Sequence, residues 1–191
     1  MFIAITGGIG SGKSYVCRIL QEKGIMVYDC DKAAKRLMRT DRRLQQRLSQ
    51  TVGQEVFPDG RLDKALLSRF IIASESNALA IDDVVHPAVA EDFMSSGFEW
   101  LESAILFESG FYARVPFDYV VCVTAPLEVR IERVMKRDSL TREKALEWIA
   151  RQMSQEEKAS RADFVVSNDG EAGLAEQIES ILETINKTKN K

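Results

Sequence analysis

The segment from Gly7 to Ser14 most constrains what this chain can fold into. Its sequence, Gly-Gly-Ile-Gly-Ser-Gly-Lys-Ser, follows the pattern G-x-x-x-x-G-K-[ST]. The apolar run Phe2 to Thr6 precedes it and predicts a buried strand, and the amphipathic segment Ser14 to Lys23 predicts a helix. Glycines let the backbone bend around an anion, and a helix N-terminus offers N–H groups and a positive dipole end. The pattern therefore predicts a phosphate-binding loop, rather than a glycine-rich turn without a ligand.

The residue types in this loop suit nucleotide chemistry. We expect Lys13 to reach the β and γ phosphates and the Ser14 hydroxyl to bind Mg²⁺. Lys13 is expected on an exposed part of the loop, where its charge matters more than its packing. The residues predicted to bind the nucleotide here are Gly8, Gly10, Ser11, Gly12, Lys13, Ser14 and Tyr15.

Short apolar runs alternate with longer amphipathic segments along the 191 residues, which is typical of a parallel α/β sheet. The runs that predict strands are Phe2–Thr6, Ile25–Tyr28, Leu101–Phe107, Tyr119–Thr124 and Phe164–Ser167. Gly24 is a natural stop for the first helix, and the last helix is predicted from about Ala172. We predict an α/β fold with a five-stranded parallel sheet flanked by helices.

Two stretches interrupt this alternation. Leucines recur at helical spacing between the second and third predicted strands, so we predict a helical insertion over residues 32–97. Within it, one interpretation of His86 is a side chain that only ends a helix, with Pro87 beginning the next. A charged insertion covers residues 138–160, where Thr141 and Ser154 are predicted to cap helices. The predicted nucleotide-binding core is the remainder, residues 1–31, 98–137 and 161–191.

The composition excludes some classes of protein. With 26 basic and 29 acidic residues, the net charge of -3 does not favour binding to nucleic acid. No apolar run approaches the roughly 20 residues that cross a membrane, and the N-terminus does not resemble a signal peptide. Cys17, Cys30 and Cys122 are odd in number and widely spaced, which predicts no disulfide framework and favours the cytoplasm.

Several classes of protein carry such a loop. A GTPase normally has an Asn-Lys-x-Asp motif, whereas the nearest match, Asn186 to Lys189, lacks the Asp. Transport ATPases have a long signature segment that is not found in this sequence. A small core with two insertions favours a small-molecule kinase, in which residues 32–97 hold an acceptor and residues 138–160 form a lid. A nucleotide-gated switch that transfers nothing is the alternative from a different class.

Two carboxylates, Asp29 and Asp31, follow the second predicted strand. Ligands of open parallel sheets lie beyond the carboxyl ends of the strands, where a carboxylate can orient or deprotonate an attacking hydroxyl. We expect one Asp to face the site and the other to cap the next helix. Asp31 is the stronger candidate for catalysis because it lies farther past the strand end, although both carboxylates could be structural.

Arginines are frequent around the second insertion, and guanidinium groups stabilise a phosphoryl group in transfer. The five are Arg133, Arg137, Arg142, Arg151 and Arg161. Arg133 and Arg137 are four residues apart and share a helix face. The alternative is a solvated basic face that pairs with Glu128 and Glu132. The turn from Asn168 to Gly170 follows the fifth predicted strand, where backbone contacts to a nucleotide base are expected.

Taken together, these residues resemble the dephospho-coenzyme A kinase family over nearly the whole chain. The matching segments are Ile5 to Ser14, Asp29 to Asp31, Val85 to Pro87, Leu106 to Glu108, Arg133 to Asp138, Arg151 with Gln152, and Asn168 to Gly170. The sequence departs from the family at Ala104, which replaces a Pro, and at Tyr15, which replaces a Thr. Tyr15 requires room for a bulkier ring at the helix start.

The resemblance implies transfer of the γ-phosphoryl of ATP to the ribose 3′-hydroxyl of 3′-dephospho-CoA, giving CoA and ADP. It implies that Asp31 is the catalytic base and that Arg133 touches the transferring phosphate. It also implies that Arg137 binds the nucleotide and His86 the substrate, and it leaves open whether Glu102 or Glu108 helps to hold Mg²⁺. Another small kinase, for a nucleotide or a hydroxylated metabolite, is the alternative enzyme.

Overall fold

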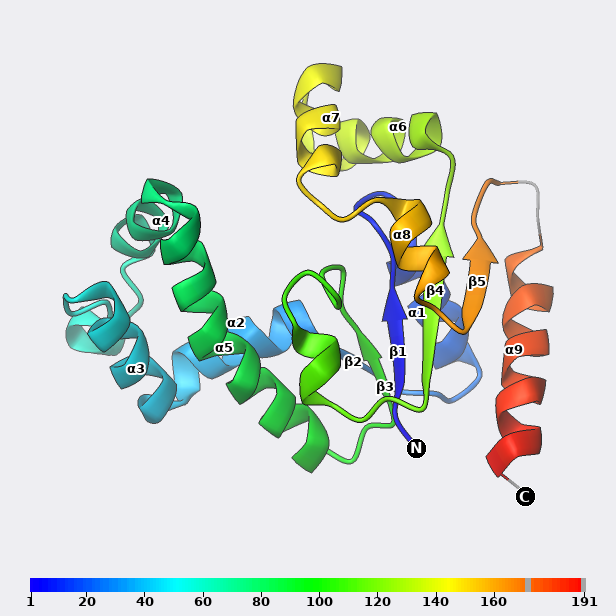
Figure 1. The fold of residues 1–191 in the computed structure, drawn as a ribbon, viewed down its shortest axis with the longest axis horizontal. Helices are drawn as coiled ribbons and strands as arrows, with labels where there is room; N and C mark the ends of the chain where they lie inside the picture. Colours follow the sequence, from blue (N-terminus) through cyan, green and yellow to red (C-terminus); the bar gives the residue numbers. More distant parts are fainter. Residues whose placement is uncertain (171–172, 190–191) are drawn as a thin grey trace. The chain divides into compact units, whose positions relative to one another are not determined.

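Five parallel strands form one sheet in the computed structural model, which describes residues 1–170 and 173–189 (Figure 1). The strands are β1 (Ile3–Thr6), β2 (Val27–Asp29), β3 (Trp100–Glu102), β4 (Tyr119–Thr124) and β5 (Phe164–Ser167), in the order β2-β3-β1-β4-β5. β1 pairs with β3 and β4, and β4 pairs with β5. The predicted fold class is confirmed, and β4 and β5 have the predicted bounds.

The third strand is shorter than predicted. β3 ends at Glu102, whereas the apolar run predicts a strand up to Phe107. The Ser103 N–H still donates to Ile5 O of β1, and beyond it the chain turns, with Ser109 N donating to Ile105 O. Leu106 is fully buried within this turn. The apolar residues after β3 therefore contribute to the core from a turn, which the hydrophobic pattern does not distinguish from a strand.

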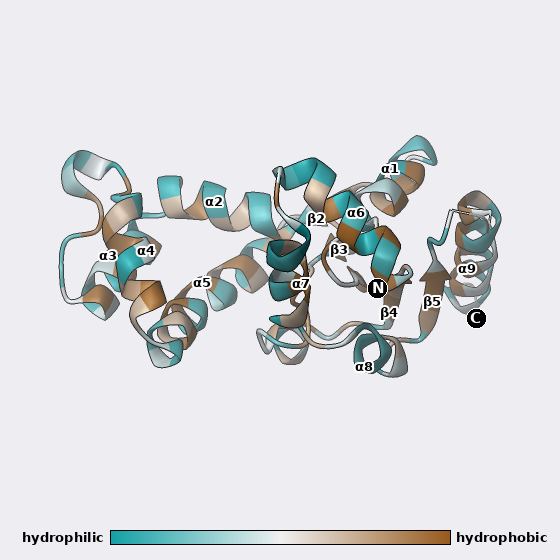
Figure 2. Ribbon diagram, turned by 90° about the horizontal axis from the view of Figure 1, so that it is seen from above, coloured by the Kyte–Doolittle hydropathy of each residue, from teal (hydrophilic) through white to brown (hydrophobic). Residues whose placement is uncertain are grey.

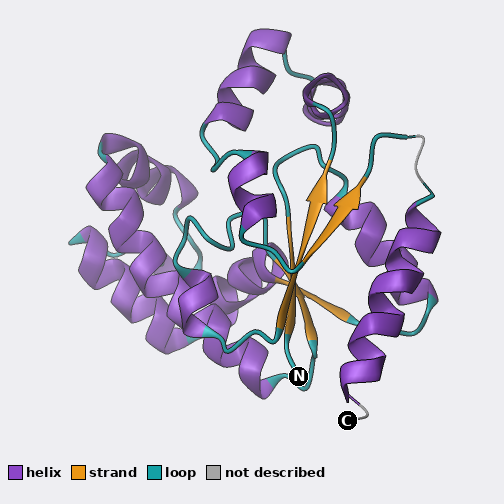
Figure 3. Ribbon diagram, turned by 45° about the vertical axis from the view of Figure 1, so that its right-hand side comes forward, coloured by secondary structure: helices purple, strands orange, loops and turns teal. Residues whose placement is uncertain are grey.

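Two helices, α1 (Lys13–Glu22) and α9 (Leu174–Lys189), pack on one face of the sheet (Figure 3). Their buried residues form a cluster with the strands: Ile3, Ile5, Val16, Leu20, Trp100, Val121, Val123, Val166, Ile178, Ile181 and Ile185. Figure 2 shows the hydrophobic residues of β4 and β5. Strand side chains alternate between the two faces, so Cys122 points to the opposite face. That face of β4 is covered by α8 (Gln155–Ser160).

The segment between β4 and β5 contains two further helices, α6 (Leu127–Asp138) and α7 (Arg142–Ala150). The Thr141 hydroxyl accepts from Lys144 N at the start of α7, and Ser154 accepts from Glu157 N at the start of α8. Both predicted N-caps are therefore confirmed. Ile131, Val134 and Ala145 are buried where α6 and α7 pack together.

The chain divides into two compact units. The first, the sheet unit, contains residues 1–28, 98–112 and 116–191, and the second, the helical unit, contains residues 29–97 and 113–115. The helical unit contains α2 (Cys30–Thr40), α3 (Arg42–Val52), α4 (Lys64–Ala73) and α5 (Glu75–Ser95), with a short 3-10 turn at Pro58–Gly60. A second 3-10 turn, Phe111–Arg114, spans the boundary between the two units. Its core includes Leu37, Leu44, Leu48, Leu67, Val89 and Phe93. Among the described residues, no helix has the length and apolar character needed to span a membrane.

The interpretation in which a helix ends at His86 and another begins at Pro87 is wrong. α5 runs without interruption from Glu75 to Ser95 and includes both residues. A proline inside a helix removes one backbone hydrogen bond and opposes the carbonyl four residues earlier. Val84, Val85, Val89 and other residues of α5 are buried on both sides of the proline, and this packing holds the helix together across it.

We predict that Phe93→Ala lowers the free energy of unfolding by about 3–5 kcal/mol, because the fully buried ring leaves a cavity in the helical unit. Urea unfolding followed by circular dichroism measures this. Met94→Ala, at the next and exposed position of α5, is the control and should change stability by less than about 0.5 kcal/mol. Equal effects of the two substitutions would contradict the assigned core.

Candidate active site

The loop between β1 and α1 bends in a way that only glycine allows at two of its positions. Gly10 has φ +80° and Gly12 has φ +95°. A Cβ on Gly10 would lie 2.6 Å from Arg130 O, and a Cβ on Gly12 would overlap the side-chain amide of Asn168. Side chains at these positions would be both strained and excluded by their neighbours. The loop is therefore a tight turn enclosed on its outer side by α6 and by the turn after β5.

Lys13 lies inside this turn. Its Nζ donates to Gly7 O at 3.0 Å and lies 3.7 Å from Glu102 Oε1, and the residue is only 9% exposed. The prediction that Lys13 lies on an exposed part of the loop is therefore wrong. Because the loop curls around the lysine, the ammonium is pre-positioned at the centre of the curve. A phosphate that enters the loop meets a positive charge already in place.

The start of α1 is suited to an anion. Gly12 is the N-cap residue and provides no side-chain hydrogen bond, and no acidic residue lies in the first turn. The first N–H groups of any helix lack partners within the helix and attract negative charge. Ser14 lies exposed in this turn, and half of Tyr15 is exposed, with its ring against the Arg18 guanidinium. The bulk of Tyr15 is thus accommodated outside the loop.

Arg133 and Asn168 join the loop to the rest of the sheet unit. Arg133 Nη1 donates to Gly10 O and Ser11 O, both at 3.3 Å, and its Nη2 donates to Asn168 Oδ1 at 3.2 Å. The buried Asn168 donates from Nδ2 to Ser11 O at 2.8 Å. The carbonyls of Gly10 and Ser11 are therefore held by side chains from α6 and from the turn after β5.

Ile9 is held on three sides. Its N–H donates to Gln152 Oε1 at 2.7 Å, and its carbonyl accepts from Arg130 Nε at 3.0 Å. Its side chain packs on the cluster around Ile131 and Val134. Arg130 is not among the predicted site residues, because an arginine in an amphipathic helix resembles a surface residue in sequence. Gln152 belongs to the family-like segment, but its contact with the loop had no sequence signal.

The other arginines around the second insertion form ion pairs. Arg137 binds Asp138 through two nitrogen atoms, and Arg142 binds Glu128 in the same way. Arg151 pairs with Glu147, and Arg161 with Glu157. Arg133 and Arg137 share α6, but only Arg133 contacts the loop. Four of the five predicted arginines thus form ion pairs, but only Arg142 pairs with a partner that the alternative interpretation named, Glu128.

Lys158 is a second functional candidate that the sequence did not indicate. Its side chain is completely buried, and Nζ lies 2.6 Å from both Ala104 O and Glu108 Oε1. Glu108 also accepts from Met153 N at 3.1 Å. This ion pair fixes the turn after β3 to α8. Glu108 is therefore occupied, whereas Glu102 lies beside the Lys13 ammonium.

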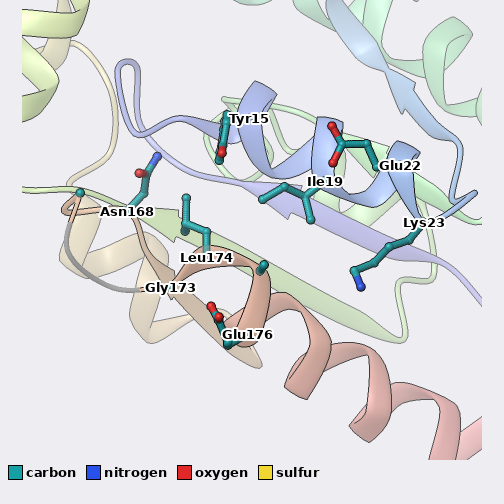
Figure 4. Close-up of a pocket in the computed structure, with 10 residues that line it drawn as sticks. Tyr15, Ile19, Glu22, Lys23, Asn168, Gly173, Leu174 and Glu176 are labelled. Atoms are coloured by element: carbon teal, nitrogen blue, oxygen red, sulfur yellow. The ribbon is translucent and has the colours of Figure 1, made fainter.

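An open cavity of about 680 Å³ lies between α1 and the start of α9 (Figure 4). Tyr15 and Ile19 line it from α1, and Asn168, Gly170 and Leu174 line it from the other side. The cavity adjoins the phosphate loop, because Asn168 is bonded to Ser11 O. The predicted nucleotide residues Asn168 and Gly170 thus share one cavity with Tyr15. The predicted start of the last helix at Ala172 lies outside the described residues.

The helical unit contains three of the predicted acceptor-side residues: Asp29, Asp31 and His86. Asp29 is also the last residue of β2. Asp29 caps α2: Oδ1 accepts from Lys32 N at 2.9 Å, and Oδ2 lies 2.9 Å from Lys32 Nζ. Burial alone would raise the pKa of Asp29, but these hydrogen bonds outweigh it and lower the pKa below its usual value. Asp31 is exposed in the first turn of α2. The expectation that one of the two carboxylates caps the next helix is therefore confirmed for Asp29.

The oxygen ligands near the loop fit Mg²⁺. The candidate donors are the Ser14 hydroxyl and the Glu102 carboxylate, and the described residues contain no cluster of three or more His, Cys, Asp or Glu that could hold a metal ion. Mg²⁺ in kinases is typically held by one or two protein oxygens together with phosphates and water, rather than by a cage of protein ligands. The donor set is thus appropriate for an ion that arrives with a nucleotide.

Comparison with known proteins identifies the family. The sequence matches the dephospho-CoA kinase family over residues 1–173. A dephospho-CoA kinase of Bacteroides fragilis is 46% identical over 183 residues, which cover 92% of this chain and 88% of that protein. The chain belongs to the dephospho-CoA kinase family. Members of this family are kinases that transfer phosphate from a nucleotide to an alcohol group, and this chain is such a kinase.

Solved structures show the same fold. The protein TT1252 from Thermus thermophilus is 35% identical, with a TM-score of 0.77 and coverage of 98% of this chain and 97% of that one. A dephospho-CoA kinase from Campylobacter jejuni is 21% identical, with a TM-score of 0.61 and coverage of 97% and 96%. At that lower identity the likeness shows the kinase fold alone. The family's arrangement of loop and sheet is therefore shared by this chain.

We predict that Gly12→Ala lowers turnover by about 10²-fold or more, because the new Cβ displaces Asn168 and shifts the loop. Steady-state kinetics with ATP measures this effect. Gly53→Ala is the matched control, since Gly53 also has a positive φ of +73° but a Cβ there would meet no atom within 4 Å. That substitution should cost about 1–2 kcal/mol of stability and leave turnover unchanged.

Proposed function

We propose that this chain transfers the γ-phosphoryl of ATP to the ribose 3′-hydroxyl of 3′-dephospho-CoA, giving CoA and ADP. The observation that carries the proposal is the match to the dephospho-CoA kinase family over residues 1–173, together with a phosphate loop that encloses Lys13. The loop supports nucleotide binding, and the family supports the acceptor.

The nucleotide phosphates would bind the amide side of the loop, at Gly8, Gly10, Ser11, Gly12 and Lys13. The hydroxyl of Ser14 would hold Mg²⁺, with Glu102 better placed than Glu108, which Lys158 and Met153 N already bind. Mg²⁺ supplies a divalent charge that screens the phosphates and makes the γ-phosphoryl more electrophilic.

The base of the nucleotide would lie near Asn168 and Gly170. Both residues line the cavity next to Tyr15, and Asn168 is directly bonded to the loop. Arg133 would stabilise charge on the transferring phosphate, because its guanidinium is anchored at the loop carbonyls. Arg137 would join it by exchanging Asp138 for phosphate, since both groups accept two hydrogen bonds from one guanidinium.

Asp31 would orient and deprotonate the acceptor hydroxyl. Asp29 is engaged on both oxygens by Lys32, which supports Asp31 as the available carboxylate of the pair. His86 and the helical insertion of residues 32–97 would bind the acceptor, and residues 138–160 would form the lid. No residue in this assignment contributes a covalent intermediate, so the phosphoryl group passes directly from ATP to the hydroxyl.

The acceptor is tested by measuring ADP release with Mg²⁺ and ATP across a panel of dephospho-CoA, adenosine and nucleoside monophosphates. We expect release to depend strongly on dephospho-CoA, and the product to carry the new phosphate at the 3′ position. Preference for another acceptor would support the alternative kinase instead. Slow hydrolysis that no acceptor accelerates would indicate a nucleotide-gated switch.

We predict that Asp31→Asn lowers turnover by about 10²- to 10⁴-fold while ATP affinity changes little, because the amide cannot accept the proton. Kinetics with dephospho-CoA and calorimetric titration with ATP measure the two effects. Asp29→Asn is the control: an Asn also caps a helix, so its cost should be below about 1 kcal/mol of stability and its turnover near normal. The reverse pattern would mean that the two carboxylates are assigned the wrong way round.

We predict that amide hydrogen exchange over residues 138–160 slows when ATP and dephospho-CoA are both bound, because closure of a lid excludes water from the transfer. Exchange measured by mass spectrometry in the presence of neither, one or both ligands tests this. The core of β4 provides the reference, since its buried residues should exchange slowly in every state. An unchanged rate over 138–160 would indicate a fixed structural segment.

A further inference from the structure

Arg130 is a buried cation on the phosphate loop. It is 6% exposed, and Nε donates to Ile9 O at 3.0 Å. The rest of the guanidinium lies against Gly8: a Cβ there would overlap Nη2 and come within 2.8 Å of Cζ. The positive charge of Arg130 therefore lies directly against the outer side of the loop. The inner side is the one that would face the phosphates.

No carboxylate among the described residues forms an ion pair with Arg130. Arg137, Arg142, Arg151 and Arg161 in the same region each have one. The charge of Glu156 acts on Arg130 and opposes the lowering of its pKa, but Glu156 makes no ion pair with it. The Cys122 thiol also lies within electrostatic reach of Arg130, but burial raises its pKa to about 11, so it carries no compensating charge. Among the described residues, this buried charge is therefore without a carboxylate in direct contact.

An isolated buried charge destabilises a protein, and a guanidinium does not escape the cost by losing its proton. Burial does lower the pKa of Arg130 from its usual value, but an arginine begins far above neutral pH. The carbonyl of Ile9 supplies only part of a counter-charge. A buried charge of this kind is best compensated by an anion that binds during the activity of the protein.

We infer that Arg130 is a further determinant of nucleotide affinity, whose buried charge is compensated by the polyphosphate of the bound nucleotide. It acts through the loop rather than by touching the phosphates: it holds the Ile9 carbonyl outward and places a positive charge behind the amides. The inference rests on the proposed nucleotide function and deepens it. Arg130 should increase the affinity for a nucleoside triphosphate more than the affinity for a diphosphate. It should not increase the affinity for a nucleoside without phosphate.

This role predicts opposite effects on stability and binding. Arg130→Met keeps most of the packing of the aliphatic stem and removes the charge. The melting temperature of the free protein should therefore be unchanged or higher, while the affinity for ATP falls by about tenfold or more. Arg130→Lys keeps the charge but not the Nε–H donor, so it should retain much of the affinity if the charge is what matters.

Calorimetric titration without any acceptor tests the inference, with ATP, ADP, inorganic tripolyphosphate and adenosine as probes. Wild type, Arg130→Met and Arg130→Lys are compared with Arg114→Met, whose arginine pairs with Asp83 and belongs to neither the phosphate loop nor residues 138–160. We expect Arg130→Met to weaken the binding of tripolyphosphate and ATP by similar factors and that of ADP by less, with the affinities of Arg114→Met close to those of wild type. Arg130→Gln serves the same comparison if the Met variant does not fold.

The inference is overturned if Arg130→Met lowers the melting temperature and binds ATP as wild type does, since the arginine is then structural. The inference is also overturned if Arg130→Met weakens the binding of ATP and of adenosine equally, because a distorted loop rather than a lost charge would then be responsible. These outcomes differ from failure of the proposed function. If wild type binds ATP but phosphorylates no dephospho-CoA, the acceptor is wrong and the role of Arg130 still stands or falls on the titrations.

Discussion

The turn of the backbone from Gly7 to Gly12 is the constraint on which the site depends. A peptide chain that points its amides at an anion must point its carbonyls away from it, and buried carbonyls need donors of their own. Here Arg130, Arg133 and Asn168 supply those donors from α6 and from the turn after β5. Lys13 instead donates to Gly7 O from inside the turn. The phosphate cradle is thus a product of the whole sheet unit rather than of its eight-residue motif.

The elements that hold the loop are themselves fixed to the sheet unit by hydrogen bonds and packing. Asn168 N donates to Thr124 O at the end of β4, so the turn that holds Gly12 and Ser11 is itself fixed to the sheet. Ile9 packs between α6 and α7 while Gln152 binds its amide. The segment after α6 is therefore in direct contact with a residue of the phosphate loop, so the proposed closure of that segment would act on the shape of the loop.

Sequence reasoning predicted the parts that depend on local pattern. The strand-loop-helix motif, the positions of β4 and β5 and the caps at Thr141 and Ser154 follow from neighbouring residues. It failed where packing decides the outcome. The turn after β3 is as apolar as a strand, α5 continues through Pro87 because both sides of it are buried, and Lys13 is enclosed by a loop that looks exposed in sequence. The positions of Arg130 and Lys158 could not be predicted from the sequence, because their partners are distant in the chain. Arg130 bonds Ile9, and Lys158 bonds Ala104 and Glu108. The acceptor was suggested only by resemblance to the family.

The central claim is that the enclosed ammonium of Lys13 provides the charge on which phosphoryl transfer depends. Turnover of Lys13→Ala with ATP and dephospho-CoA tests it most directly, with Lys13→Arg measured beside it and the melting temperature recorded for both. Loss of one pre-positioned charge should lower turnover by about 10²- to 10³-fold, with a folded protein and incomplete rescue by arginine, whose planar head does not match the space of an ammonium. Near-normal turnover of a folded Lys13→Ala would contradict the assignment of the phosphate loop.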